Sequence, residues 1–562
     1  MIELSTIFGI ISTKHQINES KFMKMKEAMY DYDYHIYKDD YYIVATTQKV
    51  SKDGKNTFCG RIRNIEELKE CIGNKEASIF DIFEKYKDVD QFDGHFIYIS
   101  REQKSVYIYK DALGIEPFYY LFEDDILYFA SEIKALLPLK EKWIIDQDGL
   151  LQVLSLLPSL DPHTTPYKGI YHLSGGECLH LKDHLSITKW WKIKESLCDK
   201  SRETIIKDIR KIVEKTIKED LEDTSNCMLS GGLDSSIIVA SASKIKPIFT
   251  FDIRYTDNDQ YFKAYDYQTT QDHPYIALMK ERYNITHETI YIEPNNLSEY
   301  LLEVLIMRDL PGMVDIDTSL FLFMASIKDK VSIILSGECA DELFCGYPWY
   351  YKPELINSPY FPWMRHLNLK NDLILEKYNI EDYIKKKKSE FLKDKSLSSK
   401  NQLVHLTTEW FMQTLLIRGD VIGRACHVDI RMPFASKPLY EYLWNVSWEN
   451  MYFNNTEKYL LREAFKDLLP NEIYVRKKNP YPKTHSPIYL DCVVQLLKGA
   501  LNESDSILYK LFKKEKLEEL IEKKGENIQY PWFGQLMTGP QLIAFLYTIH
   551  KWASLYPIEF EL

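Results

Sequence analysis

One stretch constrains the fold more than any other, because it joins an apolar segment to a helical one through glycines and serines. Residues 226–240 read NCMLSGGLDSSIIVA. Glycine lets a ligand come close to the backbone, and the first N–H groups of a helix that begins in such a loop point at that ligand. The helix dipole favours negative charge at the same place. We therefore expect a strand, an anion-binding loop and a helix, in that order.

The loop side chains indicate which anion is bound. Ser230, Ser235 and Ser236 add hydroxyl donors, and Asp234 adds a carboxylate suited to Mg²⁺ held between phosphates. A Walker A loop is excluded, because its G-x-x-x-x-G-K-[ST] spacing and its lysine are missing. The alternative is a Gly/Ser turn that only connects a strand to a helix.

Ser-Gly-Gly-Leu-Asp-Ser-Ser resembles the pyrophosphate loop of the ATP pyrophosphatase class, which cleaves ATP between the α and β phosphates and forms an adenylate. The resemblance implies that ATP as cosubstrate contacts this loop and a second one. The implied ATP-binding residues are Leu229, Ser230, Gly231, Gly232, Leu233, Asp234, Ser235, Ser236, Ser336 and Gly337.

The second loop, SGECADELFCGYP at residues 336–348, follows the apolar run 331–335 and resembles asparagine synthetase. The resemblance implies that Asp341 shares Mg²⁺ with Asp234 and that Glu338 lies near the reacting amine. In lactam-forming relatives a tyrosine of a Tyr-Glu dyad takes that position, so Glu338 favours ammonia or a small amine. An acidic, solvated helix start is the alternative for this loop taken alone.

Residues 469–478, LPNEIYVRKK, match the Pro-x-x-Ile-x-x-Arg-x-Lys segment of the same family. The match implies that Lys478 stabilises phosphate and oxyanion charge, against the alternative of a solvated basic surface. The chain departs from the family at 427–436, HVDIRMPFAS, and carries Arg424, Cys426 and Cys345 where small residues are usual. These departures leave the acyl substrate undefined, and we expect His427 to be structural.

The first 190 residues favour a sheet-rich domain, because short apolar or alternating runs occur at 7–11, 41–45, 95–99 and 106–109. Residues 7–10, 110–120 and 129–137 resemble the glutaminase half of asparagine synthetase B. The resemblance implies a four-layer sandwich of the N-terminal-nucleophile (Ntn) type.

The glutaminase chemistry is expected to be lost. In the family an N-terminal cysteine precedes Gly-Ile-Phe-Gly, and its own α-amine activates the thiol. Here Ser5 takes that position behind four residues, and Cys59, Gly60 and Arg61 replace the Asn-Gly-Glu that holds glutamine. Arg61 inverts the charge meant for the ammonium group of the substrate. Cleavage after Leu4, which would expose Ser5 as a nucleophile, is the alternative.

Length favours two domains, and patterning favours a sheet-rich first half and a parallel sheet covered by helices in the second. The resemblance implies that these are a degenerate glutaminase-like α+β sandwich at 1–195 and an α/β parallel-sheet ATP pyrophosphatase domain at 201–562. In the second, Ser201 can cap a helix with Ile205, Ile209, Ile212, Val213 and Ile217 on one face. Further strands are expected at 247–251 and 331–335.

Composition indicates which partners and which cellular compartment to expect. A net charge of −12 gives no footprint for a polyanion, so no nucleic acid is expected as partner. The nine cysteines include no C-x-x-C pair, so we expect them to be free thiols in a reducing compartment. No signal peptide and no long apolar span is visible, so we expect a cytoplasmic protein that does not enter a membrane.

The predicted function is an AMP-forming amide ligase, with Mg²⁺ as cofactor and Glu338 and Lys478 as catalytic residues. ATP, a carboxylic acid and ammonia or an amine are the expected ligands. The alternatives are an ammonia-dependent asparagine synthetase that uses aspartate, a peptide or lactam cyclase of natural-product biosynthesis, and a non-catalytic partner subunit. A homodimer and an association with a separate glutaminase both stay open.

Overall fold

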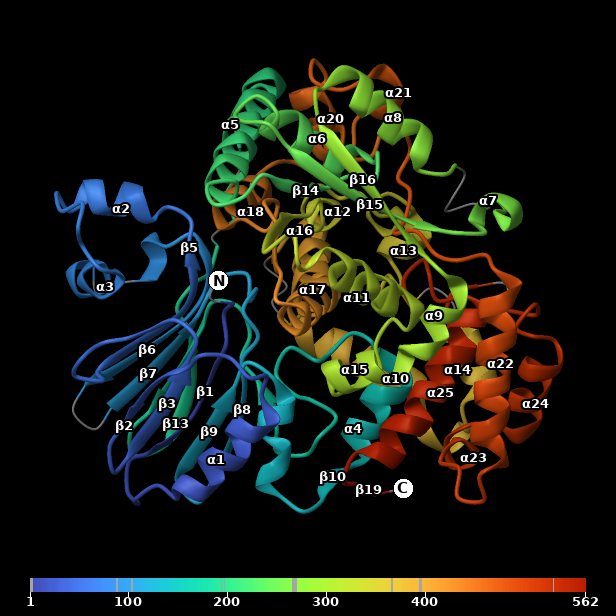
Figure 1. Cartoon of the computed structure of the whole chain (residues 1–562), viewed down its shortest axis with the longest axis horizontal. Helices are drawn as coiled ribbons and strands as arrows, with labels where there is room; N and C mark the ends of the chain where they lie inside the picture. The colour runs from blue at the N-terminus through green and yellow to red at the C-terminus, as the bar shows by residue number, and fades with distance from the viewer. Residues whose placement is uncertain are drawn as a thin grey trace.

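The computed structural model describes residues 4–86, 89–102, 105–193, 195–196, 198–264, 270–364, 367–393, 397–528 and 530–561. Figure 1 shows a sandwich of two sheets at the N-terminal end, in blue and cyan, beside a larger body of helices around a second kind of sheet. The C-terminal helices, in red, lie at the far side of that body.

The sandwich consists of two antiparallel six-stranded sheets. The first has the order β11 (Tyr171–His172), β8 (Tyr119–Glu123), β9 (Ile126–Ala130), β1 (Ile7–Ser12), β3 (Tyr42–Thr46) and β2 (His35–Lys38). The second has the order β13 (Leu185–Lys189), β12 (Glu177–Leu181), β7 (Ser105–Lys110), β6 (Gly94–Glu102), β5 (Asn56–Ile62) and β4 (Lys49–Val50). The predicted strands are confirmed within a few residues.

Strand β1 shows why this domain has four layers. Ile7 and Ile11 point into the core between the two sheets, while Phe8 points to the other face. On that outer face α1 (Glu19–Ala28) covers the sheet, and the ring of Phe22 lies 5.3 Å from that of Phe8. Helices α2 (Ile65–Cys71) and α3 (Ile79–Tyr86) cover the second sheet. The predicted Ntn-type sandwich is therefore observed.

The connection to the second half leads into α5 (Arg202–Asp220). Ser201 caps it as predicted, because its hydroxyl accepts a hydrogen bond from the N–H of Thr204 at 3.3 Å. The apolar face of α5, which includes Ile209 and Ile217, is buried. The polar face is left to solvent, as its period predicts.

The second half is built on a five-stranded parallel sheet with β14 at its centre. Its order is β16 (Thr286–Ile292), β15 (Phe249–Tyr255), β14 (Asn226–Met228), β17 (Ile333–Leu335) and β18 (Asp429–Arg431). β14 and β17 are neighbours, with Cys227 opposite Leu335. The two loops singled out in the sequence follow these strands, so both lie at one edge of the sheet, where α/β proteins bind ligands.

Helices cover both faces of this sheet (Figure 1). α6 (Leu233–Ala242) follows β14 directly, and α11 (Asp315–Ile327) and α17 (Gln413–Cys426) pack on an apolar cluster that includes Phe251 and Ile334. The other helices are α4 (Gln147–Leu151), α7 (Asn258–Tyr261), α8 (His273–Arg282), α9 (Pro294–Glu299), α10 (Leu301–Arg308), α12 (Ala340–Leu343), α13 (Pro353–Ile356), α14 (Leu367–Leu373), α15 (Ile380–Phe391), α16 (Ser399–Leu406), α18 (Lys437–Trp444), α19 (Trp448–Met451), α20 (Tyr459–Phe465), α21 (Asn471–Tyr474), α22 (Pro487–Asn502), α23 (Leu508–Leu511), α24 (Lys514–Glu522) and α25 (Gly539–Leu555).

The chain returns to its first half at the C-terminal end. β19 (Ile558–Phe560) pairs in parallel with β10 (Trp143–Ile145), and Trp143 is completely buried. The predicted domain boundary near residue 200 gave no indication of this pairing. The pairing of β10 with β19 joins the two halves at a point distant from their connection in the sequence.

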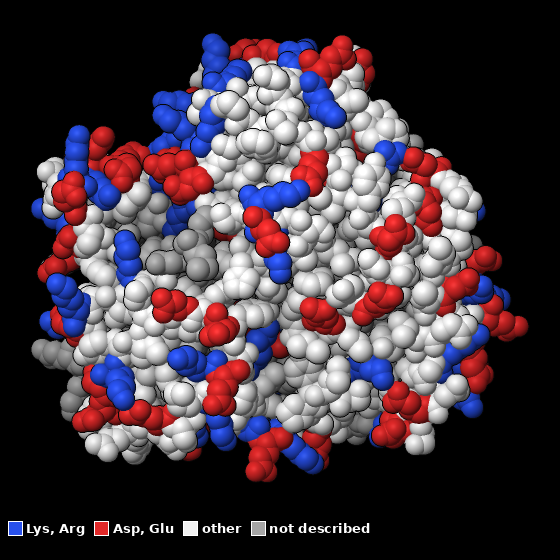
Figure 2. Space-filling model, viewed as in Figure 1, with Lys and Arg blue, Asp and Glu red and all other residues white. Residues whose placement is uncertain are grey.

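The described residues include no helix that is long and apolar enough to cross a membrane. On the face shown in Figure 2, acidic and basic side chains are interspersed rather than gathered by sign.

A buried carboxyl at the start of α11 gives a prediction about stability. Burial raises the pKa of Asp315 to about 7, and its Oδ2 accepts a hydrogen bond from Gln541 at 2.9 Å. An unfolded aspartate ionises at about pH 4. Between pH 4 and pH 7 the folded state therefore holds a proton that the unfolded state has released. The free energy of unfolding should therefore fall as pH rises from 4 to 7.

Asp315→Asn should remove this contribution while keeping an oxygen for Gln541. Thermal melts between pH 4 and 8 should show a flatter profile and a higher Tm than the parent at pH 8. Asp329→Asn, at an exposed position just after α11, is the control. An unchanged slope in Asp315→Asn would contradict the prediction.

Candidate active site

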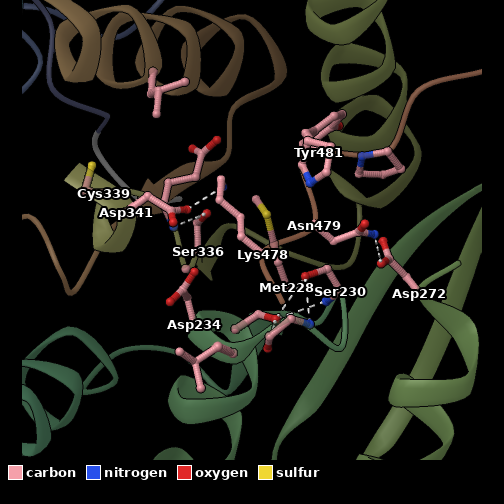
Figure 3. Close-up of a pocket in the computed structure, with 18 of the residues that line it drawn as sticks. Met228, Ser230, Asp234, Asp272, Ser336, Cys339, Asp341, Lys478, Asn479 and Tyr481 are labelled. Carbon is pink, nitrogen blue, oxygen red and sulfur yellow. Dashed lines mark hydrogen bonds and ion pairs between the residues drawn. The ribbon is translucent and has the colours of Figure 1, made fainter. Parts of the chain in front are cut away.

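A cavity of about 250 Å³ opens at the carboxyl ends of β14 and β17. We call it the main cavity. It is lined by the loop after β14, the loop after β17, one side of α17 and residues 476–482, which come together from distant parts of the sequence (Figure 3). The predicted site residues that line it are Leu229, Ser230, Gly232, Leu233, Asp234, Ser235, Ser336, Gly337, Glu338, Asp341 and Lys478.

The loop after β14 folds back on itself through its serine side chains. The N–H of Ser230 donates to Ser235 Oγ at 3.2 Å, and the two hydroxyl oxygens lie 3.1 Å apart. Gly231 has φ +65°, and a Cβ there would lie 2.6 Å from Tyr275 Cβ, so glycine is required. Gly231 does not line the main cavity, and Ser236 is fully buried in α6.

The two loops touch each other. A Cβ on Gly337 would lie 2.8 Å from the N of Ser235, so the second loop passes directly over the start of α6. This close approach brings Asp341, in the turn that opens α12, to the same side as Asp234. The predicted juxtaposition of the two carboxylates is observed.

A lysine that sequence reasoning missed lies between these carboxylates. Lys458 Nζ is 2.6 Å from Asp234 Oδ2 and 2.6 Å from Asp341 Oδ1, and its side chain is 3% exposed. The backbone of Lys458 has φ +53°, a left-handed conformation that is strained for a residue with a Cβ. Backbone strain of this kind indicates a functional role for Lys458. Its position just before α20 indicates the same, because the dipole of a helix disfavours a cation at its start.

The ionisation of this cluster follows from its charges. Burial disfavours the charged form of Lys458, but Asp234 and Asp341 outweigh it and raise its pKa. Burial raises the pKa of Asp234 more than Lys458 lowers it. At Asp341 the attraction of Lys458 and Lys478 outweighs burial and lowers the pKa to about 2. Lys458 is therefore a cation, and Asp341 a carboxylate, near neutral pH.

Lys478 approaches Asp341 from the other side. Its Nζ donates to Asp341 Oδ2 at 2.6 Å, an interaction drawn in Figure 3, and its backbone N–H donates to Glu457 at 3.2 Å. Arg476, which is buried, holds Asp272 at 2.7 Å and fixes this segment against the sheet. Lys478 thus lies beside Asp341, and its role in stabilising phosphate charge stays a prediction.

Glu338 lies in the main cavity but is not a free carboxylate. Arg418 of α17 donates to its Oε1, and the guanidinium carbon of Arg418 lies 5.2 Å from the centre of the Tyr481 ring. Burial disfavours the charged form of Arg418, but Glu338 outweighs it and raises the pKa. Arg418 is a second residue that sequence reasoning did not single out.

The rest of the cavity wall is largely apolar. The side chains concerned come from α11, α17 and the segments around them: Met313, Leu320, Phe323, Phe411, Leu415 and Leu536. Such apolar walls limit the access of water, which strengthens the electrostatic interactions of the charged groups beside them.

Gly346 has no side chain, which allows Asp341 and Lys458 to lie close together, and its substitution gives a prediction. A Cβ on Gly346 would overlap Asp341 Oδ1 and Lys458 Cε. Gly346→Ala should therefore displace both groups and lower the rate of ATP turnover by about 10²-fold, the cost typical of a displacement of about 1 Å. Gly499→Ala, where a Cβ meets no atom within 4 Å, should leave the rate unchanged. Equal rates in the two variants would contradict the prediction that this cluster takes part in ATP turnover.

The first half contains a separate cluster around Ser5. Gln48 bridges Ser5 to β5, since its Nε2 lies 3.5 Å from Ser5 Oγ and its Oε1 accepts the N–H of Gly60 at 2.7 Å. Leu4 is buried, and its carbonyl accepts a hydrogen bond from Thr47 Oγ1. The Leu4–Ser5 peptide is thus part of the packed structure. Cys59 belongs to the core between the sheets.

Arg61, predicted as part of the degenerate glutaminase site, contacts the second half of the chain. Instead of facing a ligand beside Ser5, its Nη1 pairs with Asp220 at 2.5 Å and its Nη2 donates to the carbonyl of Glu219, both on α5. Arg63 Nε also donates to Asp220, at 2.9 Å. The charge that replaces the family glutamate therefore fastens the first half to the second.

Of the other departures from the family pattern, Arg424 and Cys345 are buried and His427 is exposed. Arg424 is 2% exposed and pairs with Asp420 one turn before it. His427 ends α17 with φ +58° and packs its ring 5.1 Å from Tyr32, outside the main cavity. Cys345 adopts φ +57°, where glycine is favoured. None of these three residues lines the main cavity.

Comparison with known proteins gives a family match for each half of the chain. A family model described as asparagine synthase matches residues 208–554, and one described as glutamine amidotransferase domain matches residues 57–191. The chain is 36% identical over 539 residues to "Asparagine synthetase [glutamine-hydrolyzing] 3" of Bacillus subtilis, a match that covers 90% of this chain and 88% of that protein.

More distant relatives carry similar names. "Asparagine synthetase [glutamine-hydrolyzing] 1" of Bacillus subtilis is 24% identical over 545 residues and covers 84% of this chain and 83% of its own. The enzyme of Gallus gallus is 24% identical over 466 residues, with 75% and 71% covered. With its Ntn-type sandwich, its parallel-sheet domain and these matches, the chain belongs to the asparagine synthetase family of carbon–nitrogen ligases.

Proposed function

We propose that the protein is an AMP-forming amide ligase that adenylates a carboxylic acid with ATP and transfers ammonia or an amine to it, without hydrolysing glutamine. The observation that carries the proposal is the cluster in the main cavity, where Lys458 lies 2.6 Å from Asp234 of the Ser-Gly-Gly loop and 2.6 Å from Asp341 of the second loop. A non-catalytic subunit has no need for a buried, strained lysine at this place.

In the first step a carboxylate oxygen of the acid attacks the α-phosphorus of ATP. A P–O bond forms to the acid, the bond to the β-phosphate breaks, and pyrophosphate leaves with the electron pair. The loop at Ser230 and Ser235 receives the pyrophosphate, and Lys458 and Lys478 balance the charge that develops on the oxygens.

In the second step the nitrogen lone pair attacks the acyl carbon. A C–N bond forms, the C–O bond to AMP breaks, AMP leaves with the electron pair, and the nitrogen loses one proton. Several carboxylates line the main cavity, and we assign this proton to Glu338, which Arg418 holds in position.

The donors in the cluster also fit Mg²⁺. Asp234 Oδ1 is buried without a hydrogen-bond partner, and carboxylate oxygen is the ligand that Mg²⁺ prefers. Among the described residues no group of three or more His, Cys, Asp or Glu could hold a metal ion. Asp234 and Asp341 would therefore hold the ion together with phosphate oxygens and water. Bound there, it would neutralise phosphate charge.

The absence of glutamine hydrolysis is proposed from the cluster at Ser5. A serine whose nitrogen is in a peptide bond has no amine to activate its hydroxyl, and Arg61 is engaged with Asp220. Incubation with glutamine should release no glutamate above a buffer control. Glutamate release from a protein that mass spectrometry shows to begin at Ser5 would contradict this proposal.

The acid is the substrate that most needs testing. The relatives are named asparagine synthetases, so aspartate is the first candidate. Apolar cavity walls such as Phe411 and Leu415 favour including acids with apolar bodies, amino-acid derivatives and short peptides in the same screen. Pyrophosphate release above the rate without acid identifies the substrate. If no acid stimulates release of pyrophosphate, the proposed function is wrong.

We also propose that residues 1–195 and 201–562 act as two domains, the first serving chiefly as a packing partner. The Arg61 and Arg63 pairs with Asp220 and the pairing of β10 with β19 support a fixed arrangement of the two.

A further inference from the structure

One side of the main cavity is built from three segments that are distant in the sequence. Met313 lies just before α11, Tyr481 lies after α21, and Leu536 lies in the turn before α25, and all three line the main cavity. With Ile316 they form a small apolar cluster of their own, apart from the larger cores. We call Met313, Tyr481 and Leu536 the side wall.

The side wall lies beside the ion pair that the proposed function places at the acyl group. Arg418 donates to Glu338, and its guanidinium carbon lies 5.2 Å from the centre of the Tyr481 ring. Figure 3 shows Tyr481 and Asp341 on opposite sides of Lys478. The side wall and the aspartates that would hold the metal thus occupy different parts of the main cavity, and the body of the acid is left to the side wall.

Buried polar groups hold Met313 in place. Its N–H donates to Asp317 Oδ2 at 2.7 Å, and Arg308 Nε lies 3.3 Å from the same oxygen. Asp317 is completely buried. The residue before Met313 is glycine, and a Cβ on Gly312 would overlap Asp317 Oδ2. The backbone at Met313 therefore has one well-defined position.

Tyr481 and Leu536 are held in a similar way. Ser319 of α11 donates its hydroxyl to the Tyr481 hydroxyl at 3.2 Å. The carbonyl of Leu536 accepts the N–H of Thr538 at 2.9 Å, and Lys483 donates to Thr538 Oγ1 at 3.1 Å. None of these polar partners lines the main cavity. The side wall is therefore an apolar surface that is fixed from behind, which is the arrangement that favours a ligand with an apolar body.

The charged groups beside the side wall are already paired. Arg418, 2% exposed, pairs with Glu338. An acid that carries a further ammonium and a further carboxylate, such as aspartate, would have to break this pair or bury its own charges unpaired. Both are costly where the surroundings are apolar. An acid with an uncharged body meets neither cost and gains from the burial of its apolar surface.

From these contacts we infer that the acid activated by this protein has an apolar, uncharged body, such as a phenyl or a branched alkyl group, and that the side wall selects it. The inference rests on the proposed function and deepens it, because it names the class of acid. The bonds that form and break are those of the proposed function, and the body of the acid takes no part in them.

Non-hydrolysable mimics of the acyl-adenylate test this class of acid without turnover. In an acyl-sulfamoyl adenosine, a sulfamate replaces the phosphate, so the acyl group can be varied while the nucleoside stays the same. Titration calorimetry with the intact protein compares the 3-phenylpropionyl derivative, the aspartyl derivative and the sulfamate that has no acyl group. The 3-phenylpropionyl derivative should bind at least about 10-fold more tightly than the aspartyl derivative, the discrimination typical of an apolar group in a fitting pocket. A smaller difference, or tighter binding of the aspartyl derivative, would overturn the inference.

Two variants test whether the side wall causes the selection. Leu536→Ala and Met313→Ala each remove apolar surface, and each should lower the affinity for the 3-phenylpropionyl derivative by about 10-fold and change that for the aspartyl derivative little. The ratio of the two affinities is the quantity compared, because a general distortion weakens both derivatives alike. Leu555→Ala, at an exposed position of α25, is the control and should keep the ratio of the parent. If neither side-wall variant lowers the ratio, the side wall does not select the acid.

The same measurements separate this inference from the proposed function. If none of the three nucleosides binds, the protein holds no acyl-adenylate, and the proposed function fails together with the inference. If they bind and the aspartyl derivative is preferred, the inference alone fails. The pyrophosphate assay gives the matching comparison with free acids: 3-phenylpropionate should stimulate release more than aspartate, and the reverse order would overturn the inference.

Discussion

Lys458→Met is expected to lower the rate of acid-dependent pyrophosphate release by at least about 10²–10³-fold, the loss typical when one group that stabilises transition-state charge is removed. Lys458 is the most deeply buried cation of the cluster, placed 2.6 Å from Asp234 and 2.6 Å from Asp341. Methionine keeps the length of the side chain but removes the charge. The rate is measured with saturating ATP and acid.

The variant must be separated from a folding defect, because it leaves two buried carboxylates without their shared cation. Tm is measured with and without ATP, and Lys458→Arg supplies a second variant that keeps the charge. Lys466→Met, at an exposed position just after α20, should retain the parent rate. A folded Lys458→Met with at least a tenth of the parent rate would contradict the assigned role.

Asp234→Asn is expected to have the second largest effect, since a neutral amide is a poor ligand for a hard dication. Changes to groups that only support a metal ligand already cost about 10–100-fold in metal affinity, so loss of a ligand should cost at least that much. The Mg²⁺ concentration for half-maximal rate should rise accordingly, and the maximal rate should fall. Titration calorimetry of ATP with and without Mg²⁺ gives the same comparison without turnover.

Asp223→Asn is the matched control, because Asp223 is 61% exposed and lies close to β14 in the sequence. It should leave the Mg²⁺ dependence unchanged. An Asp234→Asn protein with the parent Mg²⁺ dependence would show that Asp234 serves only to hold Lys458.

Sequence reasoning reached the parts of the site whose signals are local. The strand, loop and helix around Ser230 are written in consecutive residues, and the position of Asp341 follows from the rule that ligand loops sit at the carboxyl ends of parallel strands. The apolar run at 7–11 likewise predicts a strand, and β1 is found there, buried along its whole length. In these cases propensity, pattern and fold agree.

The parts that were missed depend on contacts between distant residues. Lys458 and Asp234 are 224 positions apart, and Arg418 and Glu338 are 80 apart, so neither pair shows as a motif. One local signal was available, a lysine just before a helix, where its charge is disfavoured. Arg61 was recognised as a change of charge, but its partner Asp220, 159 positions away, could be found only from the structure.

Product analysis with labelled ATP tests the central claim most directly. The protein is incubated with Mg²⁺, ammonium salt and the acid identified in the screen, with ATP labelled in the α-phosphate in one sample and in the γ-phosphate in another. The account predicts acid-dependent formation of labelled AMP from the first and labelled pyrophosphate from the second, in equal amounts and without glutamine. Labelled ADP from the first and labelled inorganic phosphate from the second would contradict it.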